Sequence, residues 1–338
     1  MTLQELTLLD GVSGQEDEVR AAIIKEIEPF CDTVKIDKMG NIIAFKKGTI
    51  DKKLMMTAHM DEVGFIIKHI TEEGYCKFAS VGGIDSRILL GQRVRVGEQK
   101  IPGVIGVKAV HLTTQEERKS QVKQSELYID IGAQSQEQAQ QLVAKGDYAF
   151  FDSRYVSFGD HKIKAKALDD RVGCYALMQV LQQATCPYDL FACFTVQEEV
   201  GVRGATVAAY QIQPDVSIVL EGTVCADTYG SAPHQHVTTL GKGPAFSLVE
   251  HTSKSNTEMV KFLIWIAEKY CIPWQYKRTG AGGNEAGIIQ QTGTGTRTAV
   301  ISVPCRYIHS PVSVADARDI EAAAKLAVRA AEEINEVK

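Results

Sequence analysis

The chain has 338 residues, of which 44% are hydrophobic and 23% charged, and its formal net charge is −5. This is an ordinary globular composition, long enough for one large domain or two moderate ones, and the lack of any Lys/Arg block excludes a broad basic surface for nucleic acid or membrane. Eight scattered cysteines without a CxxC motif, no basic N-terminal region and no long apolar stretch predict a soluble cytoplasmic protein without disulfides.

The first elements in chain order are a helix and several strands. Ser13-Gly-Gln-Glu16 has the pattern of a capping box, and apolar residues behind it share one helical face, so we expect Ser13 to cap a helix. Turn residues then separate short apolar segments. The predicted strands are Thr33–Ile36, Asn41–Phe45, Lys53–Ala58 and Gly64–Ile70.

Helical pattern disappears between about residues 72 and 158. This part is punctuated by glycines and carries short alternating segments, which predicts a compact β-rich module with one short helix, Ser135–Ala144. After it, strands and helices alternate, which is typical of a three-layer α/β sheet. The predicted strands are Lys162–Leu168, Asp189–Val196, Val216–Leu220, Trp274–Lys277 and Thr298–Val303. The predicted helices are Asp170–Gln183, Gly204–Tyr210, Asn256–Tyr270, Glu285–Gln290 and a last one from about Val314.

Five predicted strands end in side chains that can bind metal. They are followed by His59-Met-Asp61, by Asp169-Asp170, by Glu198-Glu199, by Glu221 and by His309. Each pair alone is more typical of a solvated turn, but ligands of open α/β sheets bind at the carboxyl ends of the strands, so the five ends can share one crevice. Two imidazoles and several carboxylates suit Zn²⁺, Co²⁺ or Mn²⁺, and a bridging carboxylate would let them hold two ions.

Other histidines are weaker candidates. His234-Gln-His236 has a spacing compatible with metal ligation, but its Gly/Ser/Ala/Pro context indicates a loop. His69, His111, His161 and His251 have no convergent partner in the sequence and are interpreted as structural or surface residues.

The whole chain resembles the M42 aminopeptidases, which include glutamyl aminopeptidases and the TET peptidases. The resemblance lies in Gly11-Val-Ser-Gly14, Ala58-His-Met-Asp-Glu-Val-Gly64, Val81-Gly-Gly83, Lys166-Ala-Leu-Asp-Asp-Arg171, Val196-Gln-Glu-Glu-Val-Gly201 and Arg306-Tyr-Ile-His-Ser-Pro311. It implies a three-layer α/β/α phosphopeptidase-like catalytic domain, residues 1–71 and 159–338. An inserted PDZ-like or β-barrel dimerisation domain would cover residues 72–158.

The resemblance also implies a role for each strand-end residue. His59, Asp169 and Glu221 would hold one metal and Asp169, Glu199 and His309 the other, with Asp169 as the bridge because it matches the family's ligand position. Glu198 would be the general base that activates a metal-bridging water, and Asp61 would be the partner of His59. The family's clan often has a cis peptide after the bridging residue, so one is expected between Asp169 and Asp170.

The implied activity is removal of N-terminal residues from peptides by an enzyme with two divalent ions, Zn²⁺, Co²⁺ or Mn²⁺, per subunit. Homodimers through the inserted domain, assembled into a tetrahedral dodecamer, are the family expectation. The sequence departs from many relatives at Glu221, where Asp is common, and at Gly282-Gly-Asn-Glu285, which replaces Gly-Gly-Thr-Asp and puts the specificity in question. Two alternatives stay open: an endoglucanase-like glycoside hydrolase, and a non-catalytic scaffold that retains the fold.

Overall fold

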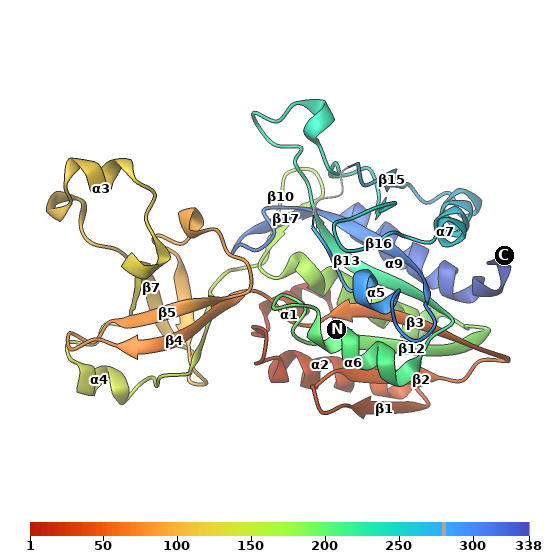
Figure 1. The fold of residues 1–338 in the computed structure, drawn as a ribbon, viewed down its shortest axis with the longest axis horizontal. Coiled ribbons are helices and arrows are strands. Elements are labelled where there is room, and N and C mark those ends of the chain that lie inside the picture. The colour runs from red at the N-terminus through yellow and green to blue at the C-terminus, as the bar shows by residue number, and fades with distance from the viewer. Residues whose placement is uncertain (279–281, 338) are drawn as a thin grey trace.

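The apolar strands assemble into two separate sheets, one in each of the two parts of the molecule seen in Figure 1. The computed structural model describes residues 1–278 and 282–337. The larger part is an α/β body, and the smaller part is a β-barrel that stands out from its side. Within the described residues, no helix combines the length and the apolar character that crossing a membrane requires.

The sheet of the larger part has eleven strands among the described residues, and its main path runs β1-β2-β12-β3-β13-β16-β17-β11-β10. Its centre is parallel, because β12, β3, β13 and β16 run side by side in one direction. The strands are β1 Thr33–Ile36, β2 Ile42–Lys46, β3 Ile50–His59, β10 Val156–Phe158, β11 Lys162–Ala165, β12 Tyr188–Thr195, β13 Val216–Val224, β14 Ala245–Phe246, β15 Gln275–Tyr276, β16 Arg297–Arg306 and β17 Ser313–Asp316.

Helices cover both faces of this sheet, which explains why its central strands are apolar throughout. One face packs against α1, α2, α5, α7 and α9 in a large core, and the other packs against α6 and α8. The helices are α1 Leu3–Leu8, α2 Asp17–Ile27, α5 Leu168–Gln183, α6 Arg203–Ile212, α7 Thr257–Lys269, α8 Ala286–Ile289 and α9 Ala317–Glu332. The predicted three-layer α/β/α architecture is therefore confirmed.

The smaller part is a closed barrel in the order β4-β5-β8-β7-β6-β9, with a core of its own. Inside it, the ring of Phe65 meets those of Phe78 and Phe151 edge-on, with centroids 4.9 and 5.1 Å away. Its elements are β4 Gly64–Ile70, β5 Cys76–Val81, β6 Arg93–Val96, β7 Ile101–Gly106, α3 Gln115–Lys119, β8 Tyr128–Asp130, α4 Gln136–Gln140 and β9 Tyr148–Phe151. The predicted β-rich module is confirmed, although the helix expected over Ser135–Ala144 is shorter.

The barrel starts earlier in the chain than the expected inserted segment, residues 72–158. Strand β4 precedes residue 72 and pairs with β5 and β9, so the barrel takes its first strand from the segment assigned to the other domain. Strand β10, within 72–158, instead pairs with β11 in the large sheet. The division therefore lies nearer to His59 and before β10.

Two sequence predictions are wrong in detail. Ser13 does not cap α2, because the helix begins after Glu16 and has no side-chain cap hydrogen bond. The last helix does not start at about Val314. Residues Ser313–Asp316 form β17 between β16 and β11, and α9 starts at Ala317 with the Asp316 carboxylate accepting the hydrogen of the Arg318 N–H.

Candidate metal centre

The parallel strands bring the five predicted strand ends to one edge of the sheet. β3 ends at His59, β12 is followed by Glu198 and Glu199, Glu221 lies near the end of β13, and β16 leads to His309. Asp169 comes from the start of α5, behind the same edge. The Asp169–Asp170 peptide bond is cis, as the resemblance implied.

His59, Asp169 and Glu221 form a buried triad. The Nε2 atom of His59 lies 3.4 Å from Oδ1 of Asp169 and 3.3 Å from Oε1 of Glu221. The side chain of His59 is 2% exposed, and the two carboxylates are buried as well. The ligand atoms of the three residues lie within 4.8 Å of one another, close enough to surround a single ion.

Asp169, Glu199 and His309 form a second, more open triad. The Nε2 atom of His309 lies 3.5 Å from Oδ2 of Asp169 and 3.3 Å from Oε2 of Glu199. His309 is 37% exposed. Asp169 therefore turns one carboxylate oxygen to each triad, which is the geometry of a bridging ligand.

A backbone carbonyl orients each of the two histidines. Nδ1 of His59 lies 3.0 Å from the carbonyl oxygen of Asp61, and Nδ1 of His309 lies 3.0 Å from that of Gly83. A carbonyl can only accept, so each Nδ1 carries the hydrogen and each Nε2 is left as the ligand atom. The carboxylate of Asp61, expected beside the ring of His59, is farther away, with Oδ1 at 3.4 Å from Nδ1.

The residues present fit two divalent ions. Oδ1 of Asp169 is buried without any hydrogen-bond partner within the described parts of the chain, although a carboxylate oxygen normally finds one. The donor set of two imidazole nitrogens and three carboxylates, with no thiolate in either triad, suits Zn²⁺, Co²⁺ and Mn²⁺.

The electrostatics of the protein alone also favour bound cations. Burial, together with neighbouring carboxylates, raises the pKa of Glu198 to about 7 and that of Glu199 to about 8. Burial likewise raises the pKa of Glu221 well above its ordinary value, with Asp170 adding to the shift. Burial opposes the charging of His309, but Asp169 and Glu199 outweigh it and raise its pKa to about 9. Divalent ions would offset the repulsion among these carboxylates.

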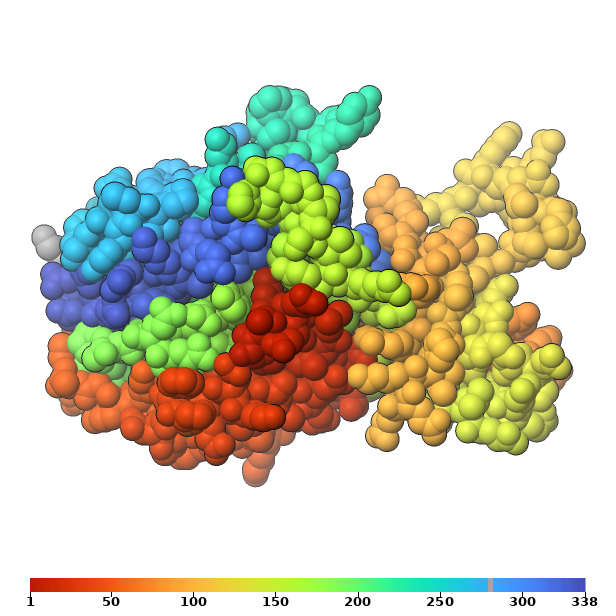
Figure 2. Space-filling model, turned by 180° about the vertical axis from the view of Figure 1, so that it is seen from behind, coloured from red at the N-terminus to blue at the C-terminus, as the bar shows by residue number. Residues whose placement is uncertain are grey.

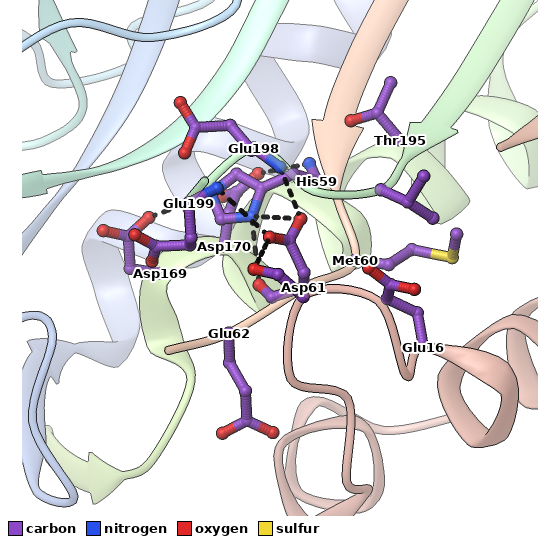
Figure 3. A network of polar contacts seen from close by, with 12 residues as sticks. Glu16, His59, Met60, Asp61, Glu62, Asp169, Asp170, Thr195, Glu198 and Glu199 are labelled. Atoms are coloured by element: carbon purple, nitrogen blue, oxygen red, sulfur yellow. Dashed lines mark hydrogen bonds and ion pairs between the residues drawn. The ribbon is translucent and has the colours of Figure 1, made fainter. Parts of the chain in front are cut away.

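Glu198 and Glu199 take different directions from adjacent positions. Figure 3 shows the carboxylate of Glu199 turned towards Asp169, whereas that of Glu198 points away from Asp61. The carboxylate of Asp61 lies beneath both residues and accepts their backbone N–H groups, at 3.0 Å from Glu198 and 3.1 Å from Glu199. Glu198 belongs to neither triad.

Two residues near the centre have contacts that the sequence did not predict. Asp170 accepts the backbone N–H of His59 at 3.1 Å. Glu285 is 1% exposed and accepts a hydrogen bond from the hydroxyl of Thr195 at the end of β12. Both residues lie in segments that the sequence already singled out: Asp170 in Lys166-Ala-Leu-Asp-Asp-Arg171, and Glu285 in Gly282-Gly-Asn-Glu285.

The remaining histidine candidates lie elsewhere. His234 lies within a short helical turn, Pro233–Gln235, His236 follows it, and neither joins a triad. His69, His111, His161 and His251 are likewise absent from both metal-binding groups of the described residues.

Comparison with known proteins establishes the family of the chain. A family model described as M42 glutamyl aminopeptidase matches residues 40–326. The lysyl aminopeptidase of Pyrococcus furiosus is 34% identical over 334 residues, which cover 96% of this chain and 94% of that protein. An aminopeptidase from the archaeon Desulfurococcus kamchatkensis is 36% identical with a TM-score of 0.94, covering 99% of this chain and 96% of its own.

The Pyrococcus horikoshii TET1 peptidase, described as assembling into a tetrahedron or a large octahedral shell, is 34% identical. Its TM-score is 0.89, and the match covers 98% of each chain. Sequence and fold agree over nearly the full length, and the chain therefore belongs to the M42 family of aminopeptidases and is a peptide hydrolase.

Proposed function

We propose that the protein is an aminopeptidase that depends on two divalent metal ions, held by the buried and the open triad. The observation that carries this proposal is the position of Asp169, whose two carboxylate oxygens face two differently placed histidines. His59 and Glu221 would complete one ion's ligands, and Glu199 and His309 the other's. Two such ions would polarise the scissile carbonyl and lower the pKa of a water shared between them.

Glu198 is the proposed general base. Its carboxylate takes the proton from the attacking water and then gives it to the leaving amine, so that one residue serves both steps of peptide hydrolysis. Its position beside Glu199, but outside both triads, supports this division of roles. The free α-amino group of the substrate would bind beside the carboxylates of the centre, which restricts cleavage to the first residue of a peptide.

The variant Glu198→Gln tests this role. It should bind the same amount of metal as the wild type and lose turnover by a factor on the order of 10² or more. Elemental analysis and a panel of aminoacyl chromogenic substrates, run with Co²⁺, Zn²⁺ and Mn²⁺, measure both properties. Acidic, basic and apolar side chains in the panel also establish the preferred N-terminal residue. Near-normal turnover in Glu198→Gln would remove it from the mechanism.

The same panel separates the proposed function from the two alternatives. A glycoside hydrolase needs a pair of carboxylates across a sugar and no metal, so it would keep its activity in EDTA. The aminopeptidase should lose activity in EDTA and regain it on addition of metal. A non-catalytic scaffold would bind no metal after loading with Co²⁺ or Zn²⁺.

We also propose that the barrel serves as a dimerisation domain and that the dimers assemble further. The barrel projects from the α/β body and exposes apolar side chains on its own surface, among them Val104, Val110 and Leu112. The TET1 relative, similar over nearly its full length, can assemble into a tetrahedron or a large octahedral shell. Analytical ultracentrifugation of the whole chain tests the proposal: a monomer at micromolar concentration would contradict it.

A further inference from the structure

The loop of residues 9–16 lies between the barrel and the metal centre. It pairs with the segment that follows His59: the N–H of Glu62 donates to the carbonyl of Gly11 at 2.8 Å, and the N–H of Ser13 donates to the carbonyl of Glu62 at 3.3 Å. Figure 2 shows the N-terminal part of the chain, in red, against the orange strands of the barrel. The loop is therefore placed to connect the two parts of the molecule.

The barrel holds this loop from one side. Asp10, which is 3% exposed, pairs with Arg95 at 2.5 Å and with Lys100 at 3.2 Å, both from the barrel. Gly14 has a φ of +90°, and a Cβ built on it would lie 2.7 Å from the hydroxyl of Tyr148 in β9. Only glycine combines this backbone conformation with so close an approach of the barrel.

Ser13 connects the same loop to the metal centre. Its hydroxyl donates to Oδ2 of Asp61 at 2.6 Å, and both side chains are buried. Since α2 has no side-chain cap, this hydroxyl takes no part in starting the helix. The carboxylate of Asp61 receives two further hydrogen bonds, one on each oxygen, from the backbone N–H groups of Glu198 and Glu199.

These three hydrogen bonds fix one carboxylate and, through it, two successive peptide groups. The direction of each backbone N–H fixes the plane of its peptide group and so restricts where the side chain on the same residue can point, and Asp61 thereby helps to hold Glu198 and Glu199 in their different directions. Without the hydroxyl of Ser13, Oδ2 of Asp61 keeps one donor, and the carboxylate gains freedom to rotate away from the two N–H groups.

We propose that Ser13 is a positioning residue, which acts through Asp61 to hold the backbone of Glu198 and Glu199 in the arrangement that hydrolysis needs. The proposal rests on the proposed function, because it takes Glu198 as the base and Glu199 as a metal ligand. It assigns a role to the Gly11-Val-Ser-Gly14 motif that capping of α2 does not fulfil.

Three variants test this role: Ser13→Ala, Asp61→Asn and the double variant. At saturating metal, Ser13→Ala should lose kcat by about tenfold, the lower end of the usual effect of residues that support a metal ligand. KM should stay within about twofold, because the hydroxyl touches no substrate. Ser13→Thr, which keeps the hydroxyl, should recover most of kcat. If Ser13 acts through Asp61, the double variant should lose no more than Asp61→Asn alone.

The matched control is Thr298→Val, near the N-terminal end of β16, whereas His309 follows the C-terminal end of the same strand. Thr298 is 2% exposed and its hydroxyl donates to the carbonyl of Thr296, so the change removes a buried hydroxyl far from the strand ends that carry the ligands. It should lower the melting temperature about as much as Ser13→Ala does and leave kcat unchanged.

Two outcomes would overturn the role of Ser13: a wild-type kcat in Ser13→Ala, or losses in the double variant that multiply. These outcomes are distinct from failure of the proposed function. If Glu198→Gln is inactive while Ser13→Ala is normal, the base assignment stands and only the positioning role fails. If Glu198→Gln is active, the base assignment fails, and if the wild type keeps its activity in EDTA, the proposed function itself fails.

Discussion

The two triads share Asp169, yet they differ in burial and in what orients their histidines. His59 is 2% exposed and its ring is held by a carbonyl of the segment that follows β3, inside the catalytic body. His309 is 37% exposed and its ring is held by the carbonyl of Gly83, in the barrel loop after β5. The buried triad is thus held within the α/β body, whereas the open triad also depends on a loop of the barrel.

The difference suggests a division between the two ions. An ion in the buried triad would be enclosed by protein and should exchange slowly, whereas an ion in the open triad would lie nearer to solvent, because the side chain of His309 is 37% exposed. The barrel, which we propose as the dimerisation domain, contacts a histidine of the open triad directly, through the carbonyl of Gly83. Dimerisation would then affect the geometry of the open triad more than that of the buried triad.

Asp169→Ala should have the largest effect, because it removes a ligand from both triads at once. We expect the variant to lose both ions and to lose activity by at least the factor on the order of 10² expected for loss of the base. Elemental analysis and the chromogenic assay measure the two losses. Asp160→Ala, at an exposed carboxylate, is the control and should change neither. Retention of half the metal in Asp169→Ala would contradict its bridging role.

The two histidine variants should separate the triads. His309→Ala should lose about half of the metal and lower the melting temperature of the metal-free protein less than His59→Ala does, because the side chain of His309 is partly exposed. His59→Ala should lose metal and also lower the melting temperature, because Glu221 and Asp169 then stay buried without the imidazole. Elemental analysis and thermal unfolding with and without metal test this contrast. Equal destabilisation by both changes would show that the burial difference has no energetic consequence.

Partial chelation of the wild type should show that the open triad releases its metal before the buried triad does. When the loaded enzyme is treated with EDTA, half of the metal should leave in a fast phase and half in a slow phase, because only the open triad faces solvent. The fast phase should disappear in His309→Ala, where the open triad is already empty. A single phase for all the metal would mean that the two triads open together.

Much of this arrangement was predictable from the sequence. A buried apolar strand that ends in charge is a strong local pattern, and parallel strands bring their ends to one edge, so the grouping of His59, Glu221 and His309 could be expected. The sharing of Asp169 came from the family resemblance. Nothing in spacing alone distinguishes it from Asp170, which instead accepts the N–H of His59.

The unpredicted features depend on contacts between distant segments. Ser13 and Glu16 have the local pattern of a capping box, but a stronger partner, the buried carboxylate of Asp61, takes the hydroxyl. Gly83 orients His309 through its backbone carbonyl, which no side-chain pattern encodes. Strand β17 is only four residues long and follows Pro311, and its pairing with β16 and β11 is a tertiary effect.

Glu16 offers the smallest expected effect, one that changes the support of the centre without touching either triad. It is 2% exposed and accepts the N–H of Gly14 at 2.6 Å, and burial raises its pKa from 4.5 to about 7. Between these two pH values the folded protein keeps a proton that the unfolded chain has released. The free energy of unfolding should therefore fall as pH rises through this window, by at most about 3 kcal/mol from this group.

Glu16→Gln should remove that part of the pH dependence, because glutamine cannot ionise and still accepts the N–H of Gly14. Thermal unfolding of the metal-free protein at pH 4.5 and pH 7.5 measures it: the melting temperature of the variant should fall less between the two than that of the wild type. Metal content at saturation should be the same in both, since Glu16 contributes to neither triad. An equal fall of the melting temperature in variant and wild type would show that Glu16 is ionised in the folded protein. A loss of metal from the open triad alone would show that the loop of residues 9–16 supports Glu199 as well as the base.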